Sequence, residues 1–157
     1  MKNNINSYKL REYEETDYNN VVNEVVSPKY LKKYLNKGLI LSTLCFLKLY
    51  KSDFYILEDE PGNIVASGVL RIKFNFKKFR RDYWIYGIEV KKNLRGCGIG
   101  KILMKELLSE LKQKNIESVY LSVATKNEIA LNLYYNLGFK RHSDTLDKYI
   151  LKLNLNE

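Results

Sequence analysis

The stretch VKKNLRGCGIGKILMKELL, residues 90–108, places three glycines within five residues, directly before an amphipathic helical pattern. Inside regular structure glycine is less favourable than alanine by about 0.5–1 kcal/mol, so a glycine cluster at the start of a helix needs an explanation. Glycine also lets a ligand approach the backbone closely. The stretch therefore raises the question of which ligand residues 95–101, here called the glycine loop, would bind.

Two familiar phosphate-binding patterns do not fit the glycine loop. A P-loop has four residues between its glycines and a Ser or Thr after Gly-Lys, whereas three residues separate Gly96 from Gly100 and Ile102 follows Lys101. The dinucleotide pattern G-x-G-x-x-G is also absent, because the loop reads G-x-G-x-G. A purely structural turn remains an alternative. Free amides at a helix start, with Arg95 nearby, instead favour a diphosphate bound without a metal ion.

The chain around this loop alternates between helical and strand patterns. Strands are predicted at 7–13, 53–60, 64–74, 83–90, 118–123, 139–142 and 148–155, and helices at 17–26, 27–38, after the glycine loop, and at 127–138. Residues 39–50 are ambiguous and weakly favour a helix, and 77–82 are predicted to be a basic loop. We therefore expect an α/β fold with a mixed sheet of about seven strands, flanked on both faces by about four helices.

Composition limits the class of protein. The chain has 157 residues and a net charge of +9, which predicts one domain over 1–157. The sequence contains neither an apolar run long enough to cross a bilayer nor a secretory leader, so a cytoplasmic protein without a membrane partner is expected. Cys45 and Cys97 lack metal-like spacing. The positive charge would favour polyanions, including a phosphorylated cofactor, but no motif predicts specific nucleic-acid binding.

Two motifs together resemble the GNAT superfamily of acyl-CoA-dependent N-acyltransferases. The first is the glycine loop, in which Arg95, Gly98 and Gly100 match the R/Q-x-x-G-x-G/A acetyl-CoA loop. The second is NEIALNLYYNLGF, residues 127–139, which is similar to the family's N-x-x-A-x-x-L-Y-x-x-L-G-F helix. The interval between them leaves room for one helix and one strand. The resemblance implies the GNAT fold, in which two central strands splay apart, with acetyl-CoA as cosubstrate and no metal ion.

The resemblance also implies roles for individual residues. Ile88 and Val90 would pair through their backbone with the pantetheine arm, as though the cofactor were an added strand. The Val90 amide would stabilise the oxyanion, Asn127 would bond the pantetheine arm, and Tyr134, rather than Tyr135, would face the thioester sulfur. The pyrophosphate would be bound by the whole glycine loop, which comprises Arg95, Gly96, Cys97, Gly98, Ile99, Gly100 and Lys101.

The general base is the weakest part of this interpretation. Some relatives carry a glutamate near the end of the fifth strand, but here that strand ends LSV and contains Ser122. Glu89 is the nearest acidic candidate, and a structural strand carboxylate, a water chain with Tyr86 or a backbone carbonyl remain alternatives. We assign no role to His142 and interpret Cys97 as a permissive loop residue.

Two functional hypotheses follow from the sequence. The first is an N-acetyltransferase that transfers an acetyl group from acetyl-CoA to a primary amine by direct attack in a ternary complex. Its acceptor would be a protein or peptide N-terminus, a lysine, a polyamine or another small amine. The second is a GNAT-fold module that binds acyl-CoA as a sensor or docking domain with little catalysis. A monomer and a homodimer are both compatible with the sequence.

Overall fold

The computed structural model describes residues 8–17, 19–21, 25 and 50–156, and its strands form one mixed sheet. Along the sheet the order is β1-β2-β3-β4-β5-β7-β6, which places β4 and β5 in its interior. All neighbouring strands are antiparallel except β4 and β5, which are parallel. The strands are β1 (Lys9–Glu12), β2 (Tyr50–Glu58), β3 (Ile64–Asn75), β4 (Arg80–Val90), β5 (Ser118–Ala124), β6 (Lys140–Asp144) and β7 (Lys148–Asn154).

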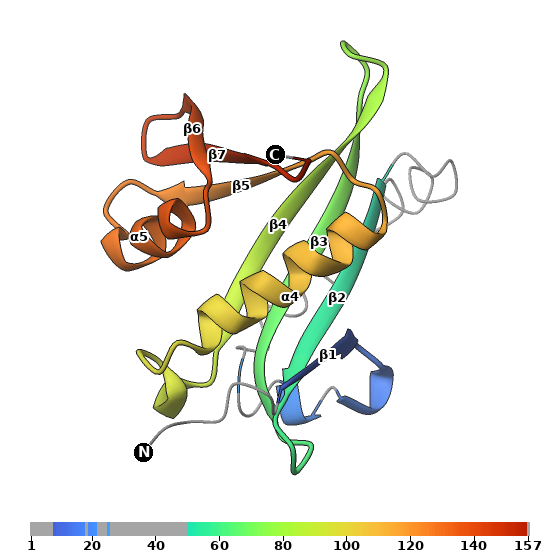
Figure 1. The fold of residues 1–157 in the computed structure, drawn as a ribbon, viewed down its shortest axis with the longest axis vertical. Coiled ribbons are helices and arrows are strands. Elements are labelled where there is room, and N and C mark those ends of the chain that lie inside the picture. The colour runs from blue at the N-terminus through green and yellow to red at the C-terminus, as the bar shows by residue number, and fades with distance from the viewer. Residues whose placement is uncertain (1–7, 18, 22–24, 26–49, 157) are drawn as a thin grey trace.

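Two α-helices are described, and both lie on the same side of the sheet. Helix α4 (Ile99–Gln113) runs across the face formed by β2, β3 and β4, whereas α5 (Glu128–Asn136) lies beside the end of β5 (Figure 1). Two short 3-10 helices are also described, η1 (Glu15–Asp17) and η2 (Lys92–Leu94). In the described part of the chain no helix is long and apolar enough to span a membrane.

The core lies between α4 and the sheet. The apolar residues predicted to recur at helical spacing after the glycine loop are all buried in the structure, namely Leu103, Met104, Leu107, Leu108 and Leu111. They pack against strand residues such as Leu70, Ile85 and Val119. Gly68 permits this close packing, because a Cβ there would lie 3.0 Å from the side chains of Ile88 and Leu107. This arrangement fixes the start of α4 against the end of β4.

The meander and the C-terminal hairpin confirm the predicted strands, with corrections at the starts of β2 and β4. Residues 77–82 were predicted to be a loop, but β4 already begins at Arg80. The ladder extends this far because Arg80 and Arg81 are paired with Asn75 and Phe74 of β3, and the Asn75 side chain donates to Asp82 at 2.7 Å. The helices predicted at 17–26 and 27–38, and the ambiguous residues 39–50, lie largely outside the described residues. Cys45 also lies there. Tyr50 is described and begins β2 because it pairs with Lys73 of β3, which corrects the weak preference for a helix at this position.

Candidate active site

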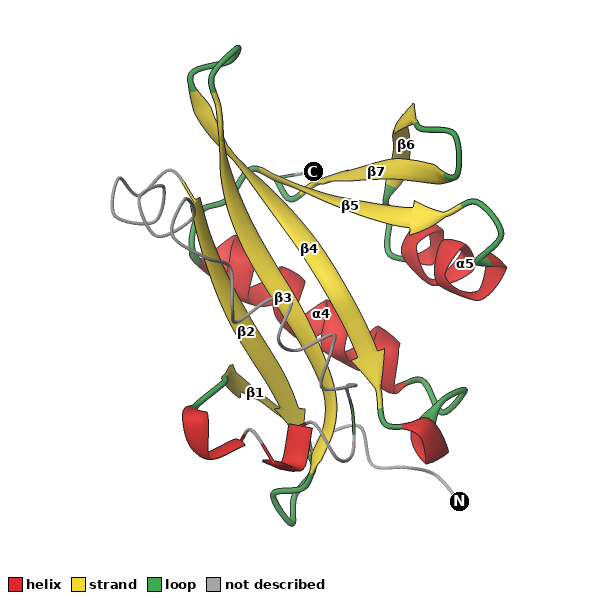
Figure 2. Ribbon diagram, turned by 180° about the vertical axis from the view of Figure 1, so that it is seen from behind, coloured by secondary structure: helices red, strands yellow, loops and turns green. Residues whose placement is uncertain are grey.

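The parallel strands β4 and β5 separate part of the way along their length. They are paired only where Tyr83–Ile85 lie opposite Val119–Leu121. Beyond this contact β4 continues to Val90 and β5 to Ala124, and the two strands point in different directions (Figure 2). We call this separation the strand fork. It confirms the predicted splaying of the central strands.

A β-bulge turns the end of β4. Ser67 of β3 pairs with Glu89, whereas Val69 pairs with Tyr86, so Gly87 and Ile88 together oppose Gly68. Gly87 adopts a φ of 58°, which glycine tolerates far better than other residues. A bulge bends its strand and increases the local twist. It therefore helps to separate β4 from β5.

The bulged end of β4 directs backbone groups into the fork. The Lys91 N–H donates to the Val65 carbonyl at 2.9 Å. Because hydrogen-bonded and non-hydrogen-bonded pairs alternate in an antiparallel ladder, the N–H and C=O of the preceding residue, Val90, point away from β3. Consistently, Arg95 Nε donates to the Val90 carbonyl oxygen from the other side at 3.1 Å. Val90 thus offers a donor and an acceptor to a molecule lying in the fork.

The glycine loop joins this end of β4 to α4. Gly96 and Gly98 have φ values of 79° and 84°, and a Cβ at either position would meet no atom within 4 Å. These glycines are therefore required by backbone conformation, and the space next to them is open. Gly100 lies deeper, where a Cβ would be 3.7 Å from the side chains of Leu133 and Val90.

Some amides of the glycine loop are already engaged in its own turns. The Cys97 N–H donates to the Leu94 carbonyl at 3.3 Å, and the Lys101 N–H donates to the Gly98 carbonyl at 3.0 Å. The first amides of an α-helix have no intrahelical acceptor, so those of Ile99 and Gly100 are available to an anion. The side chains of Cys97 and Lys101 are exposed.

Arg95 and Glu89 form an ion pair next to the fork. The Arg95 Nη2 lies 3.6 Å from Glu89 Oε2, with the Arg95 side chain 59% exposed and that of Glu89 33% exposed. Partial burial raises the pKa of the Glu89 carboxyl above its ordinary value, while the charge of Arg95 opposes this rise. Arg95 therefore reaches back towards β4, where it contacts both a carboxylate and a backbone carbonyl.

Tyr134 and Tyr135 occupy opposite environments on α5. Tyr134 is 9% exposed and belongs to the core, whereas Tyr135 is 44% exposed. Burial, with a contribution from the charge of Glu89, raises the pKa of Tyr134 to about 12. The phenol therefore stays protonated throughout the neutral range. Tyr134 and Glu89 come from separate parts of the sequence, and the effect of the Glu89 charge on the pKa of Tyr134 indicates that the two side chains lie in the same region of the fold.

Asn127 has a structural role at the start of α5. It is the N-cap residue, and its Oδ1 accepts a hydrogen bond from the Ala130 N–H at 3.1 Å. This bond satisfies one of the amides that a helix start leaves unpaired. The amide group of the side chain still offers its nitrogen as a donor.

The structure adds Ser67 of β3, which the sequence patterns did not single out, and it places Tyr86, an alternative considered for proton removal, on β4. Ser67 is fully buried opposite Glu89, and its hydroxyl has no hydrogen-bond partner among the described residues. Tyr86, the first β4 residue beyond the contact with β5, accepts a hydrogen bond from Lys73 Nζ at 2.9 Å. A single Ser in a strand carries no sequence signal, because only the strand pairing reveals that it faces Glu89.

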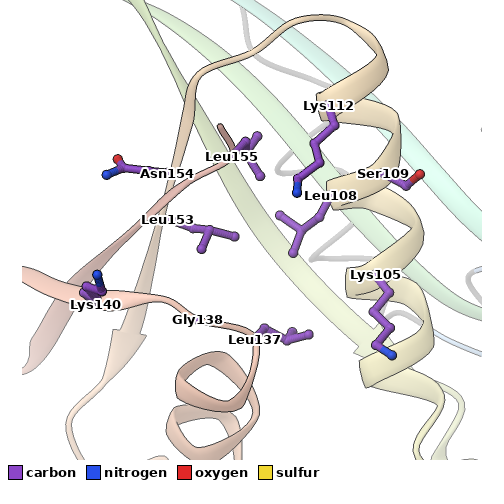
Figure 3. A pocket seen from close by; sticks show the side chains of 10 residues that line it. All are labelled: Lys105, Leu108, Ser109, Lys112, Leu137, Gly138, Lys140, Leu153, Asn154 and Leu155. Carbon is purple, nitrogen blue, oxygen red and sulfur yellow. The ribbon is translucent and has the colours of Figure 1, made fainter. Parts of the chain in front are cut away.

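A cavity of about 560 Å³ lies apart from these residues, between α4, the end of α5 and β7 (Figure 3). It is lined by Lys105, Leu108, Ser109, Lys112, Leu137, Gly138, Lys140, Leu153, Asn154 and Leu155. None of the predicted site residues is among them. His142, to which the sequence assigned no role, is exposed on β6. Its ring centroid lies 5.4 Å from that of Tyr120. In the described residues no cluster of three potential metal ligands is present. We therefore locate the candidate site at the strand fork.

A mixed sheet with two diverging interior strands, and a glycine loop leading into the following helix, is the arrangement that the GNAT resemblance predicts. Residues 10–139 match the family described as Acetyltransferase (GNAT) family. The chain belongs to this family, which confirms the resemblance, the fold class and the assignment as an acyltransferase enzyme.

Named relatives support the same assignment. The N-alpha-acetyltransferase of Sulfurisphaera tokodaii is 32% identical over 119 residues, which cover 67% of this chain and 71% of the relative. Human N-alpha-acetyltransferase 30 is 33% identical over 72% of this chain but only 27% of its own length. The chain thus spans about a quarter of that relative.

Solved structures confirm the fold. The spermidine N-acetyltransferase of Vibrio cholerae, determined in complex with CoA and spermine, superimposes with a TM-score of 0.67 over 96% of both chains. Its sequence is 17% identical to this chain, so the similarity establishes the fold alone.

Proposed function

We propose that this protein is an N-acetyltransferase that transfers the acetyl group of acetyl-CoA to the α-amine at the N-terminus of a protein or peptide. The acceptor class is supported by relatives more than 30% identical that are N-alpha-acetyltransferases. The polyamine enzymes resemble this chain only at the level of the fold. Lysine side chains, polyamines and other small amines are the competing acceptors.

The observation that carries the proposal is the direction of the Val90 backbone. Its N–H and C=O point into the strand fork, immediately before the glycine loop. An extended pantetheine arm would find there the donor and acceptor that a neighbouring strand normally supplies. Ile88 would contribute to the same edge of β4, and the side-chain nitrogen of Asn127 could donate to the arm from the start of α5.

The glycine loop fits the diphosphate of acetyl-CoA. The open space beside Gly96 and Gly98 lets a phosphate approach the backbone. The free amides of Ile99 and Gly100 and the positive end of the α4 dipole attract negative charge. Arg95 and Lys101 add positive charge from their side chains. No metal ion is part of this proposal.

Acetyl-CoA, when bound, supplies an activated thioester carbonyl that an amine can attack. The Val90 N–H would then stabilise the negative charge that develops on the carbonyl oxygen, as an oxyanion hole does. An α-amine has a pKa near 8, so a substantial minority is neutral at neutral pH and the demand on a base is modest. Glu89 is our candidate for receiving the proton that the attacking amine loses, directly or through a water molecule.

Tyr134 is our candidate for donating a proton to the departing thiolate. Its phenol is protonated at neutral pH because burial raises its pKa to about 12. The high pKa makes the transfer to a thiolate uphill. Tyr134 would therefore act chiefly by a hydrogen bond that strengthens as charge develops on sulfur. Tyr134 as a whole is 9% exposed, and a hydrogen bond in such a largely buried environment is stronger than one in bulk water.

The proposal extends to domain organisation and location. One sheet joins residues from Lys9 to Asn154, and the family match covers most of the chain, which supports a single acetyltransferase domain over 1–157. Cysteines without metal or disulfide spacing support a cytoplasmic protein. We propose a monomer or homodimer that binds acetyl-CoA and an amine acceptor, with no specific nucleic-acid partner.

An acceptor screen tests the proposed function. The protein is incubated with acetyl-CoA and peptides with free N-termini, the same peptides with blocked N-termini and internal lysines, or spermidine. We expect thiol release and one added acetyl group on the free N-terminus only. Acetylation of spermidine or internal lysine alone would refute the acceptor class but retain the enzyme. Absence of both acetyl-CoA binding and transfer would refute the function.

A further inference from the structure

The hairpin between β3 and β4 ends in an exposed aromatic and basic turn. Residues 76–81, here called the hairpin tip, extend beyond the rest of the molecule at the top of Figure 1. The side chains of Phe76 and Phe79 are 71% and 84% exposed. Scattered exposed apolar residues are ordinary on protein surfaces, but two phenylalanines at the end of a projecting hairpin form a local apolar point.

The two phenylalanines are held by local packing. The ring of Phe74, in β3, makes edge-to-face contacts with Phe76 and Phe79 at centroid distances of 5.1 and 5.4 Å. Phe79 adopts a φ of 47°, a left-handed conformation that is unfavourable for a bulky side chain. Glycine would occupy this turn position with less strain. The tip therefore presents its aromatic side chains at a conformational cost.

Positive charge surrounds these rings. The hairpin tip contains Lys77, Lys78, Arg80 and Arg81, all of them exposed. The nearby Asp82 is compensated by Arg80, whose Nε lies 3.2 Å from its carboxylate, and by the Asn75 side chain. Among the described residues no ion pair involves the other three cations. The tip consequently combines an apolar point with three cations, Lys77, Lys78 and Arg81, that form no ion pair with the described residues.

We infer that the hairpin tip docks this protein on an anionic lipid surface. Phenylalanine side chains enter the boundary between headgroups and acyl chains, and nearby Lys and Arg side chains contact the anionic headgroups. A projecting turn suits this partner, because single-stranded nucleic acid is normally bound in a basic groove rather than by a convex point. The attachment would be peripheral, and it revises the sequence-based expectation of no membrane partner.

Docking by the hairpin tip would leave the candidate active site accessible. The tip includes the first two residues of β4, and the glycine loop follows the other end of this strand, so residues 82–90 of β4 lie between them. At about 3.3 Å per residue this stretch is about 30 Å long. The strand fork thus lies at the end of β4 away from the proposed lipid contact, and acetyl transfer does not depend on it.

Vesicle co-sedimentation of the full chain tests the inference. We expect binding to phosphatidylcholine vesicles that contain phosphatidylserine, and little binding to phosphatidylcholine alone. Phe76→Ser combined with Phe79→Asn should weaken binding at least about tenfold by removing the apolar point. The combination Lys77→Gln, Lys78→Gln and Arg81→Gln should weaken it by at least as much and abolish its salt sensitivity.

Matched variants elsewhere on the surface serve as controls. Leu146→Ser removes an exposed apolar side chain outside the hairpin tip. Lys9→Gln, Lys126→Gln and Lys148→Gln together remove the same amount of charge from other exposed positions. Both control proteins should bind vesicles as the unaltered chain does. A Phe76→Trp variant should also show a blue-shifted, lipid-protected emission on binding that the unaltered chain lacks.

Other results would contradict docking of the hairpin tip on an anionic lipid surface. Equal binding to neutral and anionic vesicles, or no loss in either tip variant, would overturn the inference. Single-stranded RNA binding that is tighter than vesicle binding at physiological salt, and that is lost in the tip variants, would reassign the surface to nucleic acid. Circular dichroism and retained acetyl-CoA binding exclude misfolding as the cause of any loss.

Discussion

Arg95 contacts β4 at two places, through an ion pair of 3.6 Å with Glu89 and a 3.1 Å hydrogen bond to the Val90 carbonyl. The residue proposed to bind the diphosphate thus also contacts the proposed base and an acceptor of the strand fork. If Arg95 turns towards a phosphate, it leaves the Val90 carbonyl available to the pantetheine arm. The same movement removes a positive charge from Glu89, which favours the protonated carboxyl. Cosubstrate binding and the basicity of Glu89 are therefore coupled.

Replacing Glu89 tests its role as base. Glu89→Gln should lower kcat/KM by roughly 10²–10⁴, the usual effect of losing a positioned base, without weakening acetyl-CoA binding. The unaltered enzyme should gain activity as the pH rises through the raised pKa of Glu89, and the variant should lack this limb. Pre-steady-state rates across pH measure both effects. Glu106→Gln, at an exposed position on α4, is the control. If Glu89→Gln kept full activity, the proton of the attacking amine would be removed by water or by a backbone carbonyl instead of by Glu89.

Glu89→Gln also has a predictable effect on stability. A carboxyl whose pKa is raised by burial binds its proton more tightly in the folded state than in the unfolded state. Its contribution to folding is therefore lost as the pH rises through the folded pKa. The unaltered chain should lose stability relative to the glutamine variant over that interval. Urea unfolding at several pH values should show this trend, and the opposite trend would mean that Arg95 outweighs burial.

Arg95→Gln should affect binding and the pH profile together. Loss of a charge-assisted contact to phosphate should weaken acetyl-CoA binding by roughly 10–100-fold. Because the charge of Arg95 lowers the pKa of Glu89, its removal should move the acidic limb of activity in the free enzyme to higher pH. Lys92→Gln removes an exposed charge from η2 and should do neither. Calorimetry measures the loss of acetyl-CoA affinity, and the pH dependence of kcat/KM measures the shift of the acidic limb. An acidic limb that stays at the same pH would show that Arg95 does not influence the ionisation of Glu89.

The features that sequence predicted well are local or belong to dense motifs. The helix that starts near Asn127, and the buried leucine face of the helix after the glycine loop, are both specified by a few neighbouring residues. The turn before β3 is similar, because Gly62 adopts a φ of 85° and Asp59 bonds with Asn63. Short-range conformational preferences therefore determine these elements.

The features that sequence did not predict depend on strand pairing. The early start of β4 at Arg80 results from cross-strand partners in β3, which override the loop-like composition of 77–82. The burial of Ser67 opposite Glu89, and the reach of Arg95 back to β4, are likewise contacts across the fold. A single sequence does not reveal which residues of two strands lie opposite each other. The residues of the candidate site could therefore be predicted, but the contacts among them could not.

Gly98 offers an isosteric test of anion binding. Asn and Asp tolerate left-handed backbone better than other non-glycine residues, and a side chain at Gly98 would enter open space. Gly98→Asn should therefore retain the fold and some acetyl-CoA affinity, whereas Gly98→Asp should lose at least about tenfold more affinity through charge repulsion with phosphate. Calorimetric titration in EDTA measures both variants. Equal losses, or binding that requires Mg²⁺, would contradict the metal-free diphosphate site.

A second pH effect concerns the stability of the N-terminal region. Arg11 donates two hydrogen bonds to the buried Asp17, at 2.7 and 2.8 Å, and also pairs with Glu58. The bond to Arg11 lowers the pKa of Asp17, so its stabilising effect is present above the ordinary carboxyl range and is lost as the pH falls. Asp17→Asn should cost roughly 1–3 kcal/mol at neutral pH and less in acid.

The comparison for Asp17 is the exposed neighbour Glu15. Glu15→Gln should leave the free energy of unfolding nearly unchanged at every pH. Urea denaturation of the three proteins at neutral and acidic pH provides the measurement. A constant difference between Asp17→Asn and the unaltered chain would show that packing, and not the ion pair, explains the loss.

Tyr134 provides the sharpest test of the chemistry, because α5 supplies its own control. Tyr134→Phe removes only a hydroxyl from a buried ring that packs 5.9 Å from Phe139, so fold and acetyl-CoA affinity should change little. Turnover should fall by roughly 10²–10⁴ if this hydroxyl stabilises the departing thiolate. Because the pKa of Tyr134 is raised to about 12, no basic limb from its ionisation should appear in the alkaline range accessible to the enzyme. Tyr135→Phe, at an exposed position, should be nearly silent. Single-turnover rates with a good acceptor at saturating acetyl-CoA distinguish chemistry from product release, and an undiminished rate for Tyr134→Phe would assign protonation of the thiolate to solvent.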